Sequence, residues 1–182
     1  MNFPAILALL MLSGQQAHKP LQPPKAALAA QRKAEKPADA GNITALLEAA
    51  LQYSDGAGLE ADRQLQCLQD TWSGGDDRDI DCAPLLVASQ AQSALETAKQ
   101  ACGLLKPEKL TPEDKSTIIT LLDKLSLSAA GTEQRAQKLA EASQTQEAHL
   151  AEAYEAGSNA AEAANELQEI LSDTREILDT NN

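Results

Sequence analysis

The stretch from Thr132 to Asp179 most constrains the fold, because it contains no proline and a single glycine, Gly157. Small and apolar residues recur in it at steps of three and four, which places them on one face of a helix. A continuous helix of this length would extend about 70 Å at 1.5 Å per residue. The sequence therefore predicts one long, coiled-coil-like C-terminal helix that needs partner helices. The predicted stripe consists of Leu139, Ala142, Gln146, His149, Ala153, Ala160, Ala164, Leu167, Leu171, Thr174 and Leu178.

A first helix is expected from Asn42, which is a good N-cap residue, to about Trp72. Its apolar residues follow the helical spacing on both sides of Ser54–Gly58, a short segment with two glycines. Two interpretations stay open at this point: one helix of about 30 residues that bends, or two shorter helices that meet.

Two shorter helices are expected next. One begins near Pro84, since proline is tolerated in a first turn, and ends near Gly103. The other begins at Thr111-Pro112-Glu113-Asp114, which combines an N-cap, a first-turn proline and an acid three residues later. Gly131 and Thr132 are expected to separate this helix from the long one.

Composition favours an all-α protein. Of the 182 residues, 43% are apolar but only 2% are aromatic, so the apolar content is mostly Ala and Leu. These residues have high helix propensity, whereas the residues that favour strands are scarce. We expect an elongated antiparallel helical bundle and exclude β-sandwiches, barrels and doubly wound α/β domains.

The charge is unevenly placed. Residues 1–41 contain five basic and two acidic residues, about +3, and the remainder contains ten and twenty-five, about −15, of a total of −12. An acidic body repels the phosphates of nucleic acids and anionic lipids, so neither is expected as a partner. The partners expected are proteins, or further copies of the chain that associate through helices.

The N-terminal part divides into two segments. Residues 3–12 form an uncharged apolar run that is too short to span a bilayer but has the length of a signal-peptide core. We assign residues 1–17 to a signal peptide; the alternative is a buried N-terminal helix. Residues 18–41 contain four prolines and form an expected leader, in which 25–36 have the length for about three helical turns. Residues 42–182 form the bundle domain.

Further features agree with export to the cell surface or the exterior. Asn42-Ile43-Thr44 is an N-glycosylation acceptor sequence, so Asn42 is the expected glycan site. The C-terminal residues are polar and resemble no hydrophobic anchor signal. Membrane attachment is therefore expected only if an anchor signal is missing from this chain.

Cys67, Cys82 and Cys102 are an odd set. If residues 84–102 are helical, Cys82 and Cys102 lie about 30 Å apart, too far for a disulfide. An antiparallel hairpin would bring Cys67 and Cys82 together, and we predict that disulfide, worth about 3 kcal/mol for its loop length. Cys102 is left as a free thiol or pairs with a segment outside this chain. The competing interpretation is a cytosolic protein with three reduced thiols.

Residues suited to catalysis are not grouped in this sequence, so we expect no enzyme and no cofactor. Asp77, Asp79 and Asp81 alternate as in a calcium loop, but the required Gly and Glu positions hold Cys82 and Ala88. We therefore expect no metal site. Trp72, beside this acidic loop, is the one candidate for ligand binding, although closing the end of the core is its simpler role.

Over residues 42–179 the chain resembles the alanine-rich and variant surface glycoproteins of African trypanosomes. The pieces most similar to that family are Leu65-Gln66-Cys67-Leu68 and Ala98-Lys99-Gln100-Ala101-Cys102. The resemblance implies a glycolipid-anchored, elongated three-helix-type bundle that shields a cell or, in some members, binds a host ligand. The sequence differs from the family pattern in its C-terminal region, which has neither the anchor signal nor the cysteines.

The sequence thus predicts an exported, non-enzymatic surface-coat or interaction protein. Two alternatives remain: a surface receptor of the same fold that binds a host ligand, and an intracellular coiled-coil adapter whose N-terminal apolar run is retained.

Overall fold

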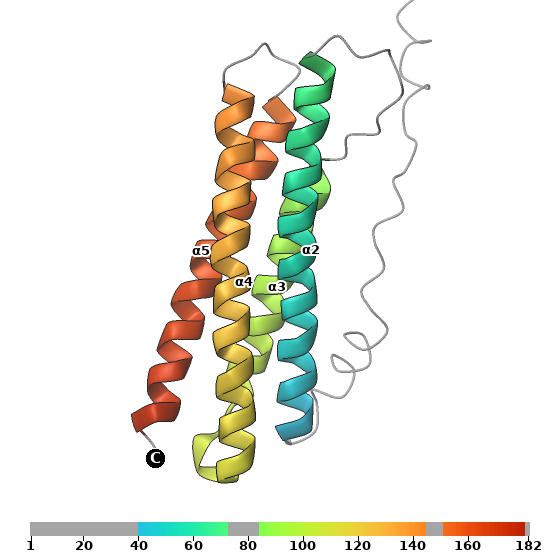
Figure 1. The fold of residues 1–182 in the computed structure, drawn as a ribbon. Coiled ribbons are helices and arrows are strands. Elements are labelled where there is room, and N and C mark those ends of the chain that lie inside the picture. The colour runs from blue at the N-terminus through green and yellow to red at the C-terminus, as the bar shows by residue number, and fades with distance from the viewer. Residues whose placement is uncertain (1–39, 73–83, 145–150, 181–182) are drawn as a thin grey trace, which may run out of the picture.

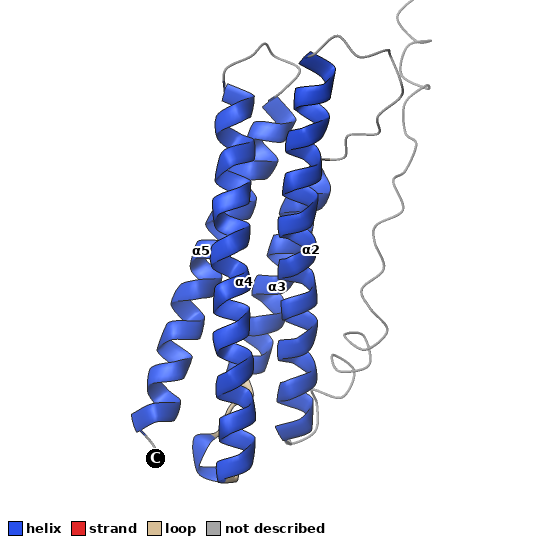
Figure 2. Ribbon diagram, in the orientation of Figure 1, coloured by secondary structure: helices blue, strands red, loops and turns tan. Residues whose placement is uncertain are grey.

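The computed structural model describes residues 40–72, 84–144 and 151–180. These residues form four α-helices, a short 3₁₀ helix and no strand, which confirms the all-α class (Figures 1 and 2). The helices are α2 (Ala40–Trp72), α3 (Leu85–Gly103), α4 (Pro112–Gln144) and α5 (Ala151–Thr180), and the 3₁₀ helix is η1 (Pro107–Lys109). The family resemblance implies a three-helix type, whereas the described residues form four packed helices.

The four helices pack as the corners of a square. Helix α2 packs against α3 and α4, and α5 packs against the same two helices from the other side. Helices α3 and α4 lie across a diagonal, so the connection that contains η1 crosses from one side of the bundle to the other (Figure 1). This crossing decides which neighbouring helices run in the same direction.

Helices α4 and α5 are antiparallel, as expected for the bundle. Arg175, near the end of α5, pairs with Asp123, in the first half of α4. Gly157, near the start of α5, lies against Ala140, near the end of α4. The two helices therefore pack side by side in opposite directions.

Helices α2 and α4 run in the same direction, so the bundle is antiparallel only in part. Ser54 of α2 is hydrogen-bonded to Ser128 of α4. Further along both helices, Asp62 of α2 forms an ion pair with Arg135 of α4. The diagonal connection causes this arrangement, since it places α4 beside α2 rather than beside α3.

Helices α3 and α5 also run in the same direction. Lys99 pairs with Glu166, and Cys102 lies beside Thr174 further along both helices. The bundle thus contains two antiparallel and two parallel neighbouring pairs (Figure 1).

The predicted continuous helix from Thr132 to Asp179 is wrong. Helix α4 passes through Gly131 to Gln144, and α5 begins at Ala151. Gln146 and His149 lie outside the described residues. Helices α4 and α5 each have a stripe of buried residues. The two stripes can pack against each other only if the chain reverses direction between the helices, which one continuous helix could not do. Packing therefore decides the break, in a region that contains neither proline nor glycine.

At Gly157 the backbones of α4 and α5 approach each other closely. A Cβ atom at this position would lie 2.8 Å from the carbonyl oxygen of Ala136, 2.9 Å from the amide nitrogen of Ala140 and 3.2 Å from its Cα. These are backbone atoms, which cannot rotate away as a side chain can. The neighbouring small residues Ala153 and Ala160 are also buried, so the helices meet over a run of small side chains.

Helix α2 is continuous through Ser54–Gly58, which selects the single-helix interpretation. A Cβ on Gly58 would lie 2.7 Å from Nη1 of Arg135 and 3.0 Å from Oγ1 of Thr132. Gly58 therefore leaves room for α4 rather than ending a helix. Its position shows that a glycine within a helical pattern can serve a packing contact.

The predicted N-caps at Thr111 and Asn42 have different outcomes. The capping box at Thr111 is confirmed: the Thr111 hydroxyl accepts the Asp114 amide at 3.1 Å, and the Asp114 carboxylate accepts the Thr111 amide at 3.3 Å. Asn42 is not the N-cap, because α2 begins two residues earlier at Ala40.

The core is built almost entirely from aliphatic side chains. It joins buried stripes from all four helices. The largest fully buried side chains are Ile43, Leu46, Leu47, Val87, Leu95, Ile118, Leu122, Leu125, Leu139, Leu167, Leu171 and Leu178.

Replacing Gly157 tests the close approach of α4 and α5. Gly157→Ala should lower the free energy of unfolding by about 1–2 kcal/mol, because the overlap with α4 backbone outweighs the usual gain in helix propensity. Gly131→Ala is the matched control, since a Cβ there meets nothing within 4 Å. This variant should gain about 0.5–1 kcal/mol. Urea unfolding followed by circular dichroism measures both, and equal stabilisation of the two variants would contradict the predicted contact.

Candidate functional site

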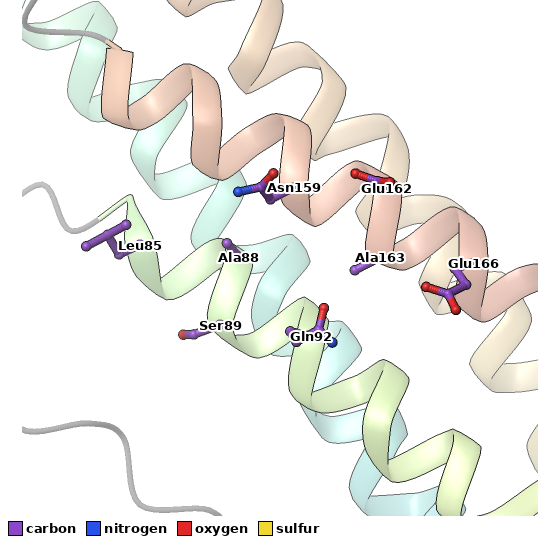
Figure 3. A pocket seen from close by; sticks show the side chains of 8 residues that line it. All are labelled: Leu85, Ala88, Ser89, Gln92, Asn159, Glu162, Ala163 and Glu166. Atoms are coloured by element: carbon purple, nitrogen blue, oxygen red, sulfur yellow. The ribbon is translucent and has the colours of Figure 1, made fainter.

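A groove between α3 and α5 is the candidate binding site. It has a volume of about 600 Å³ and opens to solvent. Figure 3 shows the residues of α3 on one side and those of α5 on the other. Its lining residues are Leu85, Ala88, Ser89 and Gln92 of α3, and Asn159, Glu162, Ala163 and Glu166 of α5.

The groove combines apolar and acidic surface. Leu85 is 65% exposed, although it is a large aliphatic residue at the start of α3. Ala88 and Ala163 add small apolar surface, and Glu162 and Glu166 supply carboxylates from α5. Such a surface suits a ligand that has both apolar groups and positive charge.

An ion pair lies at one end of the groove. The Lys99 ammonium is 2.6 Å from a Glu166 carboxylate oxygen, and both side chains are about half exposed. Exposed pairs of this kind contribute at most about 1 kcal/mol, so Glu166 remains available to compete for another cation. None of the ion pairs within the described residues includes Glu162.

A polar cluster joins α2 and α4 inside the bundle. The buried Thr132 hydroxyl donates to the Ser54 carbonyl at 2.8 Å, and Ser128 donates to the Ser54 hydroxyl at 2.9 Å. The Ser128 hydroxyl also donates a hydrogen bond to the Asp55 carboxylate. Every hydroxyl in the cluster has a partner, so the cluster fixes the register of the two helices rather than forming an open site.

The three cysteines differ in state and position. Cys67, in α2, is buried and disulfide-bonded. Cys82 lies outside the described residues, so the Cys67–Cys82 pairing stays a prediction. Cys102, in α3, is a free thiol.

Cys102 is held between α3 and α5. Burial raises the pKa of its thiol, because removal from water disfavours the thiolate. A hydrogen bond with Thr174 acts in the opposite direction and lowers the pKa. Burial is the larger effect, which makes this thiol less nucleophilic than an exposed one at neutral pH.

The other predicted site residues do not gather around the groove. Asn42 lies in the first turn of α2 and is half-buried, and the Thr44 hydroxyl of its acceptor sequence donates to the Ala40 carbonyl. Trp72 is the last residue of α2. The acidic loop with Asp77, Asp79 and Asp81 lies outside the described residues.

The groove itself was not predicted from the sequence. Glu162 and Glu166 are one turn apart on α5, a spacing that is ordinary for acids on an exposed helix face. The one residue that could have indicated a binding surface is Leu85. It is a large apolar residue that follows Pro84 and lies outside the buried stripe of α3. The packing of α3 against α5, which forms the groove, could not be predicted from the sequence.

Metal clusters and membrane-spanning helices are both absent from the described residues. These residues contain no group of three or more His, Cys, Asp or Glu side chains that could hold a metal ion. No helix among them is long and apolar enough to cross a membrane.

Comparison of the chain with protein-family models, curated proteins and solved structures gave no match. The resemblance to trypanosome surface glycoproteins therefore stays a prediction from the sequence.

Alkylation tests the environment of Cys102. We expect iodoacetamide to react more slowly than with an unfolded control, and the pH of half-maximal rate to lie above that of an exposed thiol, since burial raises the pKa. Thr174→Val should move that pH further up, because it removes the hydrogen bond that favours the thiolate. A profile at or below that of an exposed thiol would show that burial does not dominate.

The same pKa shift links the thiol to stability. A folded-state pKa above the unfolded value means that the folded chain binds the proton more tightly. The free energy of unfolding should therefore fall as the pH rises from the unfolded-state pKa of the thiol to its higher folded-state pKa. Cys102→Ser should remove that part of the pH dependence.

Proposed function

We propose that this chain is an exported, non-enzymatic surface-coat or interaction protein whose working part is the helical bundle. The disulfide at Cys67 carries this proposal. Disulfides persist in oxidising compartments and are rare in the cytosol, so this bond favours export over the intracellular adapter. The apolar run at residues 3–12 agrees with the same route.

The surface of the bundle supports a role in display rather than catalysis. The ion pairs that cross between helices, such as Arg135–Asp62 and Lys99–Glu166, lie at the surface and serve the register of the bundle. The excess of acidic residues, which gives a net charge of −12, makes neighbouring copies repel rather than aggregate. Long helices then give reach with a core of aliphatic side chains, which suits a protein displayed at high density.

The groove between α3 and α5 favours a second candidate function, a surface receptor of the same fold. Leu85, at its edge, follows the loop next to Trp72, which the sequence marks as the candidate ligand contact. A ligand for this receptor would carry apolar groups and positive charge. Substitution of Trp72 and of Glu162, each followed by binding measurements, separates the receptor from a passive coat protein.

The intact mass of the protein from its native source tests the proposal. Export predicts loss of residues 1–17, added glycan mass at Asn42 and one disulfide, which together identify the compartment. Reduction should add two mass units, and Asn42→Gln should remove the glycan. A chain that keeps Met1 and three free thiols would overturn export and favour the adapter.

A further inference from the structure

The groove between α3 and α5 carries an inference that does not depend on the proposed function. We infer that it binds the chain's own basic leader, residues 25–36, as an intramolecular partner. Residues 1–39 lie outside the described part of the structure, so the inference uses their sequence and the geometry of the groove.

Charge favours this occupant. Residues 25–36 contain Lys25, Arg32, Lys33 and Lys36 against a single acid, Glu35, and the segment lies in the only basic part of an acidic chain. A second copy would instead present its own acidic bundle, which the groove repels.

The acidic residues of the groove come from α5. Glu162 and Glu166 line the groove itself. Glu96 and Glu155 are exposed and lie one turn from the groove residues Gln92 and Asn159 on the same helix faces. Lys99 is the cation on these faces, and it is already paired with Glu166.

Shape favours the same segment. Between Lys25 and Arg32 the leader has Ala26, Ala27, Leu28, Ala29 and Ala30, which are small apart from the leucine. Such residues fit a shallow groove with Ala88 and Ala163 in its lining, where larger side chains would be held away. The exposed Leu85 gives Leu28 an apolar partner, and covering it removes a large apolar side chain from water.

The groove is within reach of the leader. A Cβ on Gly56 of α2 would lie 2.5 Å from Oε1 of Gln90, so these residues are level in the bundle. Ala40 is sixteen residues before Gly56, about 24 Å along the helix axis. The fifteen residues from Lys25 to Ala40 span up to about 50 Å when extended. A tether of this length gives the leader a millimolar effective concentration at the groove, so weak contacts suffice to hold it there.

Zero-length cross-linking of the full chain tests this contact. A carbodiimide joins a lysine amine to a carboxylate as an amide, and the reagent takes up the water that is lost. We expect links within one chain from Lys25, Lys33 or Lys36 to Glu162 or Glu166, mapped by mass spectrometry at low protein concentration. The Lys99–Glu166 pair, at 2.6 Å, is the internal positive control.

A matched pair of charge variants makes the test specific. Glu162→Gln with Glu166→Gln should lower the yield of links from the leader lysines to the α3 and α5 groove faces, including Glu96 and Glu155, about tenfold, which corresponds to about 1.4 kcal/mol. Asp173→Asn with Glu176→Gln removes the same charge from exposed positions on the same helix and should leave that yield unchanged. Raising the salt concentration should lower it in the parent chain.

Three results would overturn the inference. The first is a map in which Lys99 is linked and the leader lysines are not. The second is an even spread of leader links over acids of the whole bundle, which would show unspecific attraction. The third is links found only between two chains. The leader lysines follow the predicted cleavage site, so they are present whether or not the signal peptide is removed. The cross-linking result therefore does not depend on export, and failure of either proposal leaves the other testable.

Discussion

The close approach of α4 and α5 at Gly157 is the contact on which the rest of the bundle depends. It needs a residue without a side chain at one position and alanines around it, because the backbone of α4 occupies the space that a Cβ would take. Once these helices are antiparallel and in register, their two buried stripes close one side of the core. Helices α2 and α3 then cover the other side.

The parallel pairing of α3 with α5 follows from this arrangement and creates the groove. Small residues let some helices approach closely, whereas Leu85 at the start of α3 remains exposed beside α5. The result is a bundle in which the concave surface between α3 and α5 combines carboxylates with apolar groups. The inferred binding of the basic leader rests on that combination of charge and shape.

Sequence patterns predicted the helices better than their connections. The capping box at Thr111 is a local feature, because two side chains three residues apart determine it. Gly58 and Gly131 were harder to interpret, because glycine has low helix propensity wherever it occurs. In the structure both lie inside helices, one for a packing contact and the other with open space around it. The candidate site could not be predicted, because its residues come from helices that are about 70 residues apart.

The sequence by itself determined the all-α class, the helix faces that are buried, the acidic surface and the residues available for a disulfide. These properties depend on residue type and on spacing within one turn or a few turns. The tertiary structure alone decided that the stretch after Thr132 belongs to two helices, that α3 lies beside α5, and that a groove opens between them. Helical periodicity marks which face of a helix is buried but carries no information on which other helix covers it, and that choice depends on packing between distant parts of the chain.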